Sequence, residues 1–419
     1  MKKRNPLAIV IAIVLMDVLG IGILIPIIPL LLTDPAYPYY IAGVSVSQGL
    51  LILGLLTAIY PLMQFFVTPL LGQLSDHIGR RPVLLFCLLG TAFGYVLFAL
   101  GIVFQSIPLL FVSRAIDGIT GGNISVAQAV IADSTTPQKR AKAFGLMGAA
   151  FGIGFIIGPF LGGTLSDPSI LPWFNATTPF WFAAILSLLN AIFLYFFFAE
   201  TLETKSSARF SFFQSFINIK KAVTNPVLRN LFSTSFLFQS GFSFFTSFFG
   251  AYLIYRFAFT QSNIGNFFAL VGILMAFTQG FVTARVAKRF STPAILSVSL
   301  LGVSITVLAY GLVPYAWMLY LVTPFQALAM GLTTSNLTSL ISRSADATRQ
   351  GEVLGINASV QALAQSIPPV LAGILAAATS PHFPIFIGAF LVFLAWVVFI
   401  TVTKQTAKDI ISHVPATAS

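Results

Sequence analysis

Three ionisable residues, Asp17, Arg114 and Asp117, interrupt stretches of the chain that are otherwise apolar. Arg114 and Asp117 are three residues apart, so on a helix they share one face. Counted at about 1.5 Å per residue, Asp17 lies ~15 Å from the first residue of its stretch. Arg114 and Asp117 lie ~12 and ~16 Å from the first residue of theirs, which starts on the other side of the membrane. A lone charge at such a depth in a membrane costs about 2.5–3.5 kcal/mol, so we expect these side chains to pair.

Two carboxylates and one guanidinium leave one negative charge in excess when both acids are ionised. Burial favours the protonated form of a carboxyl group, whereas a nearby guanidinium favours the ionised form. One acid is therefore left short of a partner and can take up a proton near neutral pH, which would make a proton switch. The alternative is a static salt bridge that locks two helices together. Asp17 and Asp117 are both candidates for the group that titrates.

The composition indicates that these residues lie in a polytopic membrane protein. Of 419 residues, 57% are hydrophobic and 8% are charged, whereas soluble domains carry about 25% charged residues. Mean hydropathy is +0.94, which excludes a soluble enzyme, a disordered chain and a coiled coil. The single cysteine, Cys87, and three scattered histidines provide neither a disulfide framework nor a metal site. No nucleotide-binding loop or zinc-protease motif is present, so we expect no enzyme, no cofactor and no bound metal.

Twelve apolar stretches are long enough to cross a membrane, which takes about 20 residues. The first carries Asp17 and lacks a small-residue cleavage site, so it is expected to remain as a spanning helix. The expected spans are 7–32, 47–71, 82–103, 106–131, 141–164, 177–198, 227–253, 262–284, 293–313, 316–341, 352–377 and 382–403.

The basic residues orient these spans. Of the 22 Lys and Arg residues, all except Arg114 and Arg256 fall in the terminal segments or in alternate connections. Short cytoplasmic loops collect Lys and Arg, so we expect both termini in the cytoplasm and a location in the cell inner membrane. The net charge of +11 then reflects topology and contact with anionic lipid rather than binding of nucleic acid.

A long connection divides the chain into two sets of six spans. The expected domains are an N-terminal half, 1–198, a cytoplasmic linker, 199–226, a C-terminal half, 227–403, and a cytoplasmic tail, 404–419. In the linker, apolar residues at Phe210, Phe213, Phe216, Ile217 and Val223 follow a near-helical spacing beside two lysines. This pattern favours an amphipathic helix at the membrane surface, and a loosely ordered linker is the alternative.

The connection between the second and third spans runs from Gly72 to Pro82 and contains Asp76, Gly79, Arg80 and Arg81. It resembles the signature loop of the major facilitator superfamily. The resemblance implies an all-α membrane fold of 12 transmembrane helices in two six-helix halves with inverted repeats, and alternating access between them. It also implies that Gly72, Asp76, Gly79, Arg80 and Arg81 form a conformational switch. In that switch Arg80 would pair with Asp133, and Asp76 would meet the start of the eleventh helix.

The fifth span is rich in glycine, and its spacing resembles the motif of the proton-linked antiporters in that family. The alternative interpretation is an ordinary packing face of small residues. The first span around Asp17 and the Arg114-x-x-x-Gly118 sequence also resemble drug antiporters, most of all the tetracycline/proton group. The motif residues are Gly145, Gly154, Gly158, Pro159, Gly162 and Gly163.

The chain departs from the tetracycline carriers at three places. Those carriers have an acid in the third helix, where this chain is neutral near Gly94, and another in the ninth, where 293–313 has none. Their eighth-helix histidine aligns near Met275. These differences argue against a metal–tetracycline substrate, though not against proton antiport.

The second half carries amides, hydroxyls and many phenylalanines in its spans instead of charges. This composition suggests a wide aromatic cavity for a weakly polar solute. Lipid-facing phenylalanines and amide bonds between helices are the alternative. The candidate substrate-binding residues are Gln239, Phe242, Phe245, Gln279, Asn336, Asn357, Gln361 and Gln365.

Together these features predict a monomeric, proton-coupled exporter of a small, amphiphilic compound. A nutrient or metabolite importer of the same fold, either a symporter or a facilitator, is the alternative. The expected partners are a small-molecule substrate, protons and the lipid bilayer.

Overall fold

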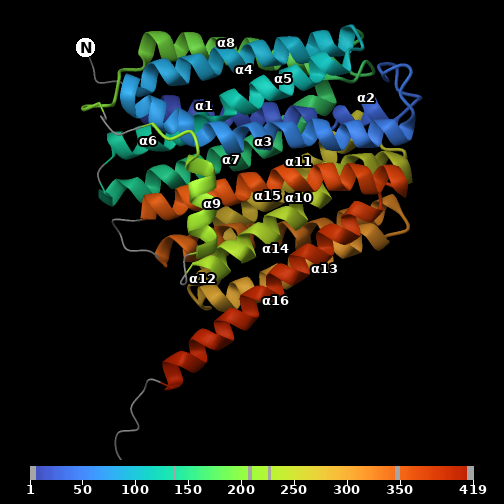
Figure 1. Ribbon diagram of the computed structural model, residues 1–419. Coiled ribbons are helices and arrows are strands. Elements are labelled where there is room, and N and C mark those ends of the chain that lie inside the picture. Colours follow the sequence, from blue (N-terminus) through green and yellow to red (C-terminus); the bar gives the residue numbers. More distant parts are fainter. Residues whose placement is uncertain (1–5, 136, 206–209, 225–227, 345–349, 413–419) are drawn as a thin grey trace, which may run out of the picture.

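The computed structural model describes residues 6–135, 137–205, 210–224, 228–344 and 350–412. Within these ranges, the side chains of 137–142, 144, 145, 148, 149, 151, 350–352 and 402–412 are also outside the description. The described segments are helical with short connections (Figure 1). The elements before residue 200 are α1 (Pro6–Leu24), α2 (Ile28–Thr33), α3 (Val46–Ile78), α4 (Arg80–Val103), α5 (Ile107–Thr120), η1 (Gly121–Asn123), α6 (Ile124–Ser134), α7 (Pro137–Leu165) and α8 (Thr178–Phe197). The later ones are α9 (Gln214–Thr224), α10 (Arg229–Phe257), α11 (Gln261–Phe277), η2 (Thr278–Val282), α12 (Thr283–Ala287), α13 (Thr292–Leu312), α14 (Ala316–Arg343), α15 (Gln350–Ala378) and α16 (Phe383–Ser412).

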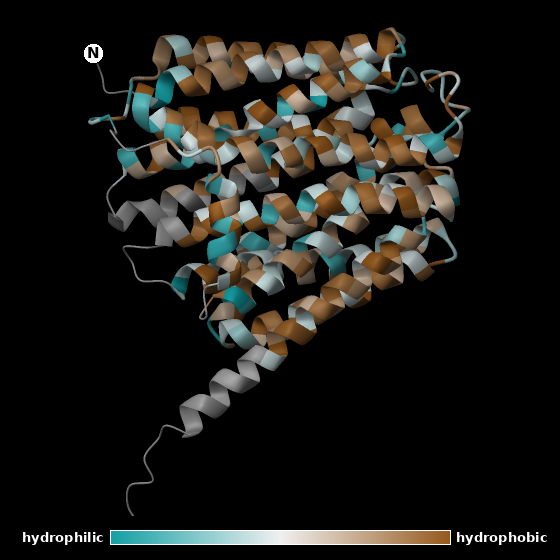
Figure 2. Ribbon diagram, in the orientation of Figure 1, coloured by the Kyte–Doolittle hydropathy of each residue, from teal (hydrophilic) through white to brown (hydrophobic). Residues whose placement is uncertain are grey.

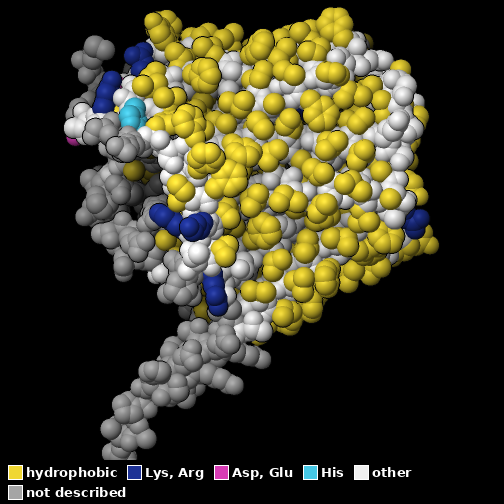
Figure 3. Space-filling view, in the orientation of Figure 1, with side chains coloured by type: hydrophobic (Ala, Val, Ile, Leu, Met, Phe, Trp, Pro, Cys, Tyr) yellow, Lys and Arg dark blue, Asp and Glu magenta, His cyan; other side chains and the backbone are white. Residues whose placement is uncertain are grey.

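Ten helical segments of the described chain are long and apolar enough to cross a membrane. The two remaining expected spans correspond to α5–η1–α6, which a 3₁₀ turn divides, and to α7. The fold is therefore all-helical and consistent with twelve spans. Apolar residues dominate the helices along most of their length (Figure 2). On the face seen in Figure 3, hydrophobic side chains form a broad belt and most Lys and Arg side chains lie at one edge.

Three predicted spans depart from a regular α-helix along their length. The first breaks between α1 and α2 at Pro26, because proline lacks the N–H group that continues the helix. The fourth tightens into the 3₁₀ turn η1 at Gly121-Gly122-Asn123. The eighth widens into the π-helix η2, a feature that recurs at functional sites.

The helices form two sets, α1–α8 and α10–α16, which meet along two pairs of helices. One pair is α3 with α15, and the other is α7 with α11 (Figure 1). Both contacts use glycines where the backbones approach closely. A Cβ atom on Gly54 would lie 2.9 Å from Cα of Gly373, and one on Gly163 would lie 3.1 Å from Cα of Gly265. Ser262 Oγ at the start of α11 donates a hydrogen bond to Asp167 Oδ2 in the connection after α7, and this bond also joins the two sets of helices.

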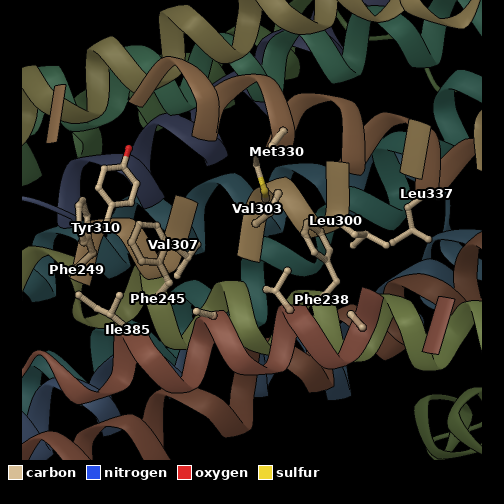
Figure 4. Packing of buried hydrophobic residues seen from close by; sticks show 14 of the residues in the cluster. Phe238, Phe245, Phe249, Leu300, Val303, Val307, Tyr310, Met330, Leu337 and Ile385 are labelled. Carbon is tan, nitrogen blue, oxygen red and sulfur yellow. The ribbon is translucent and has the colours of Figure 1, made fainter. Parts of the chain in front are cut away.

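The apolar core is distributed between the sets. One cluster of buried residues joins α10, α11, α13, α14, α15 and α16, and Figure 4 shows its aromatic part around Phe245, Phe249 and Tyr310. A second cluster joins α1–α5 and α8 to α10 and α15. A third fills the other end of α1, α3, α4, α6, α7 and α8. The charged residues described next lie between these apolar layers.

Candidate functional site

Arg114 and Asp117 form an ion pair inside α5. The guanidinium donates from Nη1 to Asp117 Oδ2, and the two residues are 6% and 4% exposed. The guanidinium carbon of Arg114 also lies 4.6 Å from the ring centroid of Tyr60 on α3, a cation–π contact. Asp117 packs against α4, since a Cβ atom on Gly94 would be 3.6 Å from the Asp117 Cβ. α3 and α4 thus hold the pair from two sides.

Asp17 lies on α1 and is 6% exposed, and among the described residues it forms no ion pair. Asn123 of η1 is its polar neighbour and Asp117 is within electrostatic range. Asp17 Oδ2 and both polar atoms of the Asn123 side chain have no hydrogen-bond partner within the described residues. The two side chains are therefore neighbours that do not form a hydrogen bond. One turn further along α1, the hydroxyl of Tyr95 lies directly over Gly20, where a Cβ atom would be 1.3 Å from its oxygen.

The buried charges explain what this site can do chemically. In the described part of the chain, the buried charged residues are Asp17, Arg80, Arg114 and Asp117. Arg80 belongs to a different cluster, so the α1–α5 site holds two acids and one guanidinium. The ion pair compensates Arg114 and Asp117, whereas a negative charge on Asp17 would be buried without a counter-ion, which is costly. The arrangement is suited to binding and releasing a proton at Asp17.

The α7 glycines connect this site to the contact between the two helix sets. Toward α1, a Cβ atom on Gly154 would be 2.7 Å from Cβ of Val18, and one on Gly158 would be 2.7 Å from the carbonyl oxygen of Leu19. Gly162 meets the backbone of Ile23 in the same way. Gly163 faces α11, and the carbonyl oxygen of Pro159 lies 2.7 Å from a Cβ atom on Gly265 of α11. α7 is therefore wedged between α1, next to Asp17, and α11.

Gly145, the first residue of the expected glycine motif, lies in α7, but its surroundings are outside the described residues. Asp76 was expected to meet the start of α15, where the side chains of residues 350–352 are likewise outside the description.

The loop between α3 and α4 forms a second polar cluster. Arg80 donates to Asp76 Oδ1 and, from Nε over 3.0 Å, to Asp133 Oδ2 at the end of α6. It also donates to Ser75 Oγ over 2.6 Å. Gly79 makes the turn possible, because its φ of 115° lies in a region that other residues rarely adopt. Gly72 packs on Ser125 of α6, and Arg81 donates to the carbonyl oxygen of Tyr195 in α8.

Glu200, which sequence reasoning did not single out, caps α4 from the segment after α8. Its Oε1 accepts the backbone N–H of Arg80 over 2.9 Å, and its Oε2 accepts that of Arg81 over 3.0 Å. The N–H groups of Thr201 and Leu202 also donate to it. Burial alone would raise the pKa of Glu200, but these four N–H groups outweigh burial and hold the pKa below its usual range. The carboxylate thus compensates the positive N-terminus of α4.

We expect Glu200→Gln to lower the melting temperature of the purified protein at neutral pH. Loss of a charged cap costs ~1 kcal/mol. Because the folded-state pKa is lowered, this stabilisation is present above the ordinary glutamate value of 4.5 and is lost as the pH falls through the lowered value. Thermal unfolding followed across that range should therefore show the two proteins converging in acid. The matched control is Glu203→Gln in the exposed part of the same segment, and an equal effect of both changes would contradict the cap.

A small aromatic cavity of about 40 Å³ lies inside the second helix set, between α10, α11, α13 and α14. Phe242 and Phe245 line it, and the rings of Phe245 and Tyr310 stack at 5.6 Å (Figure 4). Gln326 is the amide in its wall, and its Oε1 accepts a hydrogen bond from Thr306. A cavity with these walls suits an apolar or aromatic group.

The other candidate substrate residues do not line this cavity. Asn357 is buried and its Oδ1 accepts from Ser235 of α10 over 2.9 Å, while Asn336 donates to Leu332 O of its own helix over 2.8 Å. Asn357 thus joins α15 to α10, whereas Asn336 bonds within its own helix. Gln279 is exposed on the π-helix η2. Gln239, Gln361 and Gln365 are half-buried on α10 and α15.

Sequence reasoning also left Asn123 and the two tyrosines beside the charged site, Tyr60 and Tyr95, unassigned. Asn123 directly follows two glycines inside a predicted span, and a polar side chain at a helix break is a signal that could have identified it. The tyrosines carry no comparable signal, because a tyrosine in an apolar run fits equally well at a lipid-facing position.

Helices of this number and length, with charges buried between them, define a polytopic membrane protein. The family model of the Major Facilitator Superfamily matches residues 9–369 and, separately, 280–418, and the chain belongs to this superfamily.

Individual relatives extend over nearly the whole chain. The chain is 33% identical to the class D tetracycline resistance protein of Salmonella ordonez over 372 residues, 88% of this chain and 89% of that protein. The crystal structure of the human organic anion transporter MFSD10 (TETRAN) superposes with a TM-score of 0.70 at 26% identity, covering 95% of this chain and 100% of that one. A D-xylose–proton symporter superposes with a TM-score of 0.74 at 16% identity, covering 94% and 96%, which shows the shared fold alone.

Proposed function

We propose that this chain is a proton-coupled antiporter that exports a small amphiphilic compound from the cytoplasm by alternating access. We also propose that it works in the cell inner membrane as a monomer with both termini in the cytoplasm. Similarity to tetracycline resistance proteins supports export. The single observation that carries the proton coupling is Asp17 Oδ2, which is buried without a hydrogen-bond partner in the described chain beside the Arg114–Asp117 pair.

In this mechanism Asp17 is the proton carrier and Asp117 is the fixed counter-ion of Arg114. A proton on Asp17 lets α1 pack into the apolar layer, and its release leaves a negative charge that favours rearrangement toward Arg114 or water. Coupling requires that substrate and proton favour different facings of the carrier. The α7 glycines, wedged between α1 and α11, are suited to carrying a movement at Asp17 to the contact between the helix sets.

The substrate cavity is proposed around Phe242, Phe245 and Gln326. Aromatic rings would contact the apolar part of the compound, and the single amide would orient a polar group. Asp76, Arg80, Arg81 and Asp133 are proposed to stabilise one facing of the carrier through the contacts in the α3–α4 loop.

Transport in oriented membrane vesicles tests direction and coupling together. We expect inverted vesicles, with the cytoplasmic face outward, to accumulate fluorescent amphiphilic dyes when their interior is acidified. The dyes should leak out when an ionophore collapses the gradient. Accumulation only in right-side-out vesicles under an inward proton gradient would instead support an importer. Accumulation that is unaffected by the ionophore would contradict proton coupling.

A further inference from the structure

The helix α9, between the two sets, has its polar face toward the protein. Its buried residues Ser215, Asn218 and Ala222 are three and four positions apart and form one stripe. The residues of the opposite side are exposed and largely apolar. Phe212 and Phe213 just before the helix are 71% and 69% exposed, and Val223 near its end is 67% exposed. In Figure 1, α9 runs across the direction of the long helices at one end of the molecule.

The polar stripe joins helices from both sets. Ser215 Oγ donates to the carbonyl oxygen of Phe65 in α3, and Asn218 Nδ2 donates to Ser359 Oγ in α15 over 3.0 Å; both bonds are buried. Before the helix, Ser211 N donates to Gln73 Oε1 of α3 over 2.7 Å, and Gln73 Nε2 donates back to Ser211 O over 3.2 Å. α9 therefore lies across α3 and α15 and joins them through hydrogen bonds.

The outer face of α9 continues the lipid-facing surface of α3. The Phe216 ring lies 5.6 Å from that of Phe65 and 5.8 Å from that of Phe66, which is itself exposed on α3. Exposure of such a contiguous aromatic patch to water is unfavourable. Lys220 is exposed on the same short helix, and Figure 3 shows Lys and Arg side chains at the border of the hydrophobic belt. Apolar residues beside an exposed lysine match the boundary between acyl chains and anionic headgroups.

We propose that α9 is seated in the headgroup layer of an anionic membrane leaflet. Its aromatic face, including Phe213 and Val223, enters the lipid, Lys220 meets the phosphates, and its polar face holds α3 to α15. The partner is thus the phospholipid surface itself. This inference goes beyond the transport reaction and does not depend on the substrate or on proton coupling.

Spin labels on the full-length protein in vesicles test this position of α9 at the membrane surface. The chain has one cysteine, Cys87, which is buried, so Phe213→Cys and Val223→Cys can each be labelled selectively. In vesicles of phosphatidylcholine and phosphatidylglycerol, we expect both labels to collide more with lipid-soluble oxygen than with a water-soluble nickel chelate. A label at Glu203→Cys, in the exposed linker before α9, should show the reverse. The two α9 positions lie at opposite ends of the face, so a local disturbance at one of them does not decide the result.

The charge contribution is tested by Lys220→Gln, with Lys205→Gln in the exposed linker as the matched control. With phosphatidylglycerol present, Lys220→Gln should lower the ratio of lipid-seated to water-exposed label about fivefold, which corresponds to ~1 kcal/mol per lysine near an anionic surface. Lys205→Gln should leave the ratio unchanged. Free access of the nickel chelate to both α9 labels would overturn the proposal. Exclusion of both probes, as under a protein partner, would also overturn it. A ratio that does not depend on phosphatidylglycerol in the labelled variants that keep Lys220 would overturn it as well.

Discussion

In inverted vesicles, Asp17→Asn is expected to reduce proton-driven dye accumulation to the level seen when no proton gradient is applied. Asparagine has nearly the same size as aspartate, so the packing of α1 against α7 should persist. It cannot gain or lose a proton, so the coupling step is removed. Asp17 is buried and its Oδ2 has no partner in the described chain, so no counter-ion is left uncompensated by the change.

Two further readouts separate loss of coupling from loss of folding. Exchange of dye between the two sides of a vesicle without a gradient needs no net proton movement, and we expect Asp17→Asn to retain it. Asp34→Asn, the same substitution in the loop after α2, should behave as the wild type in both assays. Gradient-driven accumulation in the Asp17→Asn protein would show that another group carries the proton.

Arg114→Gln is expected to be the most damaging single change in the charged site. It leaves Asp117 buried beside Tyr60 without its guanidinium, and breaking a buried ion pair by removing one partner costs about 3–5 kcal/mol. We expect a low yield of folded protein and no coupled transport. The measurements are the melting temperature in detergent and dye accumulation in vesicles.

The double substitution Arg114→Gln with Asp117→Asn separates stability from coupling. Replacing both partners of a buried pair by neutral groups is often close to neutral for stability. The double variant should therefore recover most of the melting temperature lost in Arg114→Gln, yet remain without normal coupling, because a deprotonated Asp17 would then have no guanidinium to rearrange toward. Equal destabilisation of the single and double variants would contradict the pairing of Arg114 with Asp117.

Hydropathy predicted the apolar stretches well because the membrane requires about 20 such residues per span. It missed the breaks at η1 and η2, because a 3₁₀ or π turn changes backbone geometry without changing apolar composition. It also missed the capping role of Glu200, since that carboxylate and the start of α4 are 120 positions apart and meet only in three dimensions.

The charged site was predictable in part. The cost of burying charge predicts that Asp17, Arg114 and Asp117 pair, and the three-residue spacing places Arg114 and Asp117 on one helix face. Which acid lacks a partner depends on side-chain packing against Tyr60 and Gly94, and the sequence carries no signal for it. The amides of the second set show the same limit, because Asn357 and Gln326 look alike in sequence but one holds two helices together and the other faces a cavity.

Infrared difference spectroscopy of the purified protein between acid and alkaline pH tests the role of Asp17 most directly, because it needs no substrate. A protonated carboxyl group in an apolar site gives a C=O band that disappears on deprotonation. We predict such a band in the wild type and in Asp34→Asn, and its absence in Asp17→Asn. An unchanged band in Asp17→Asn would contradict the assignment of Asp17 as the proton carrier.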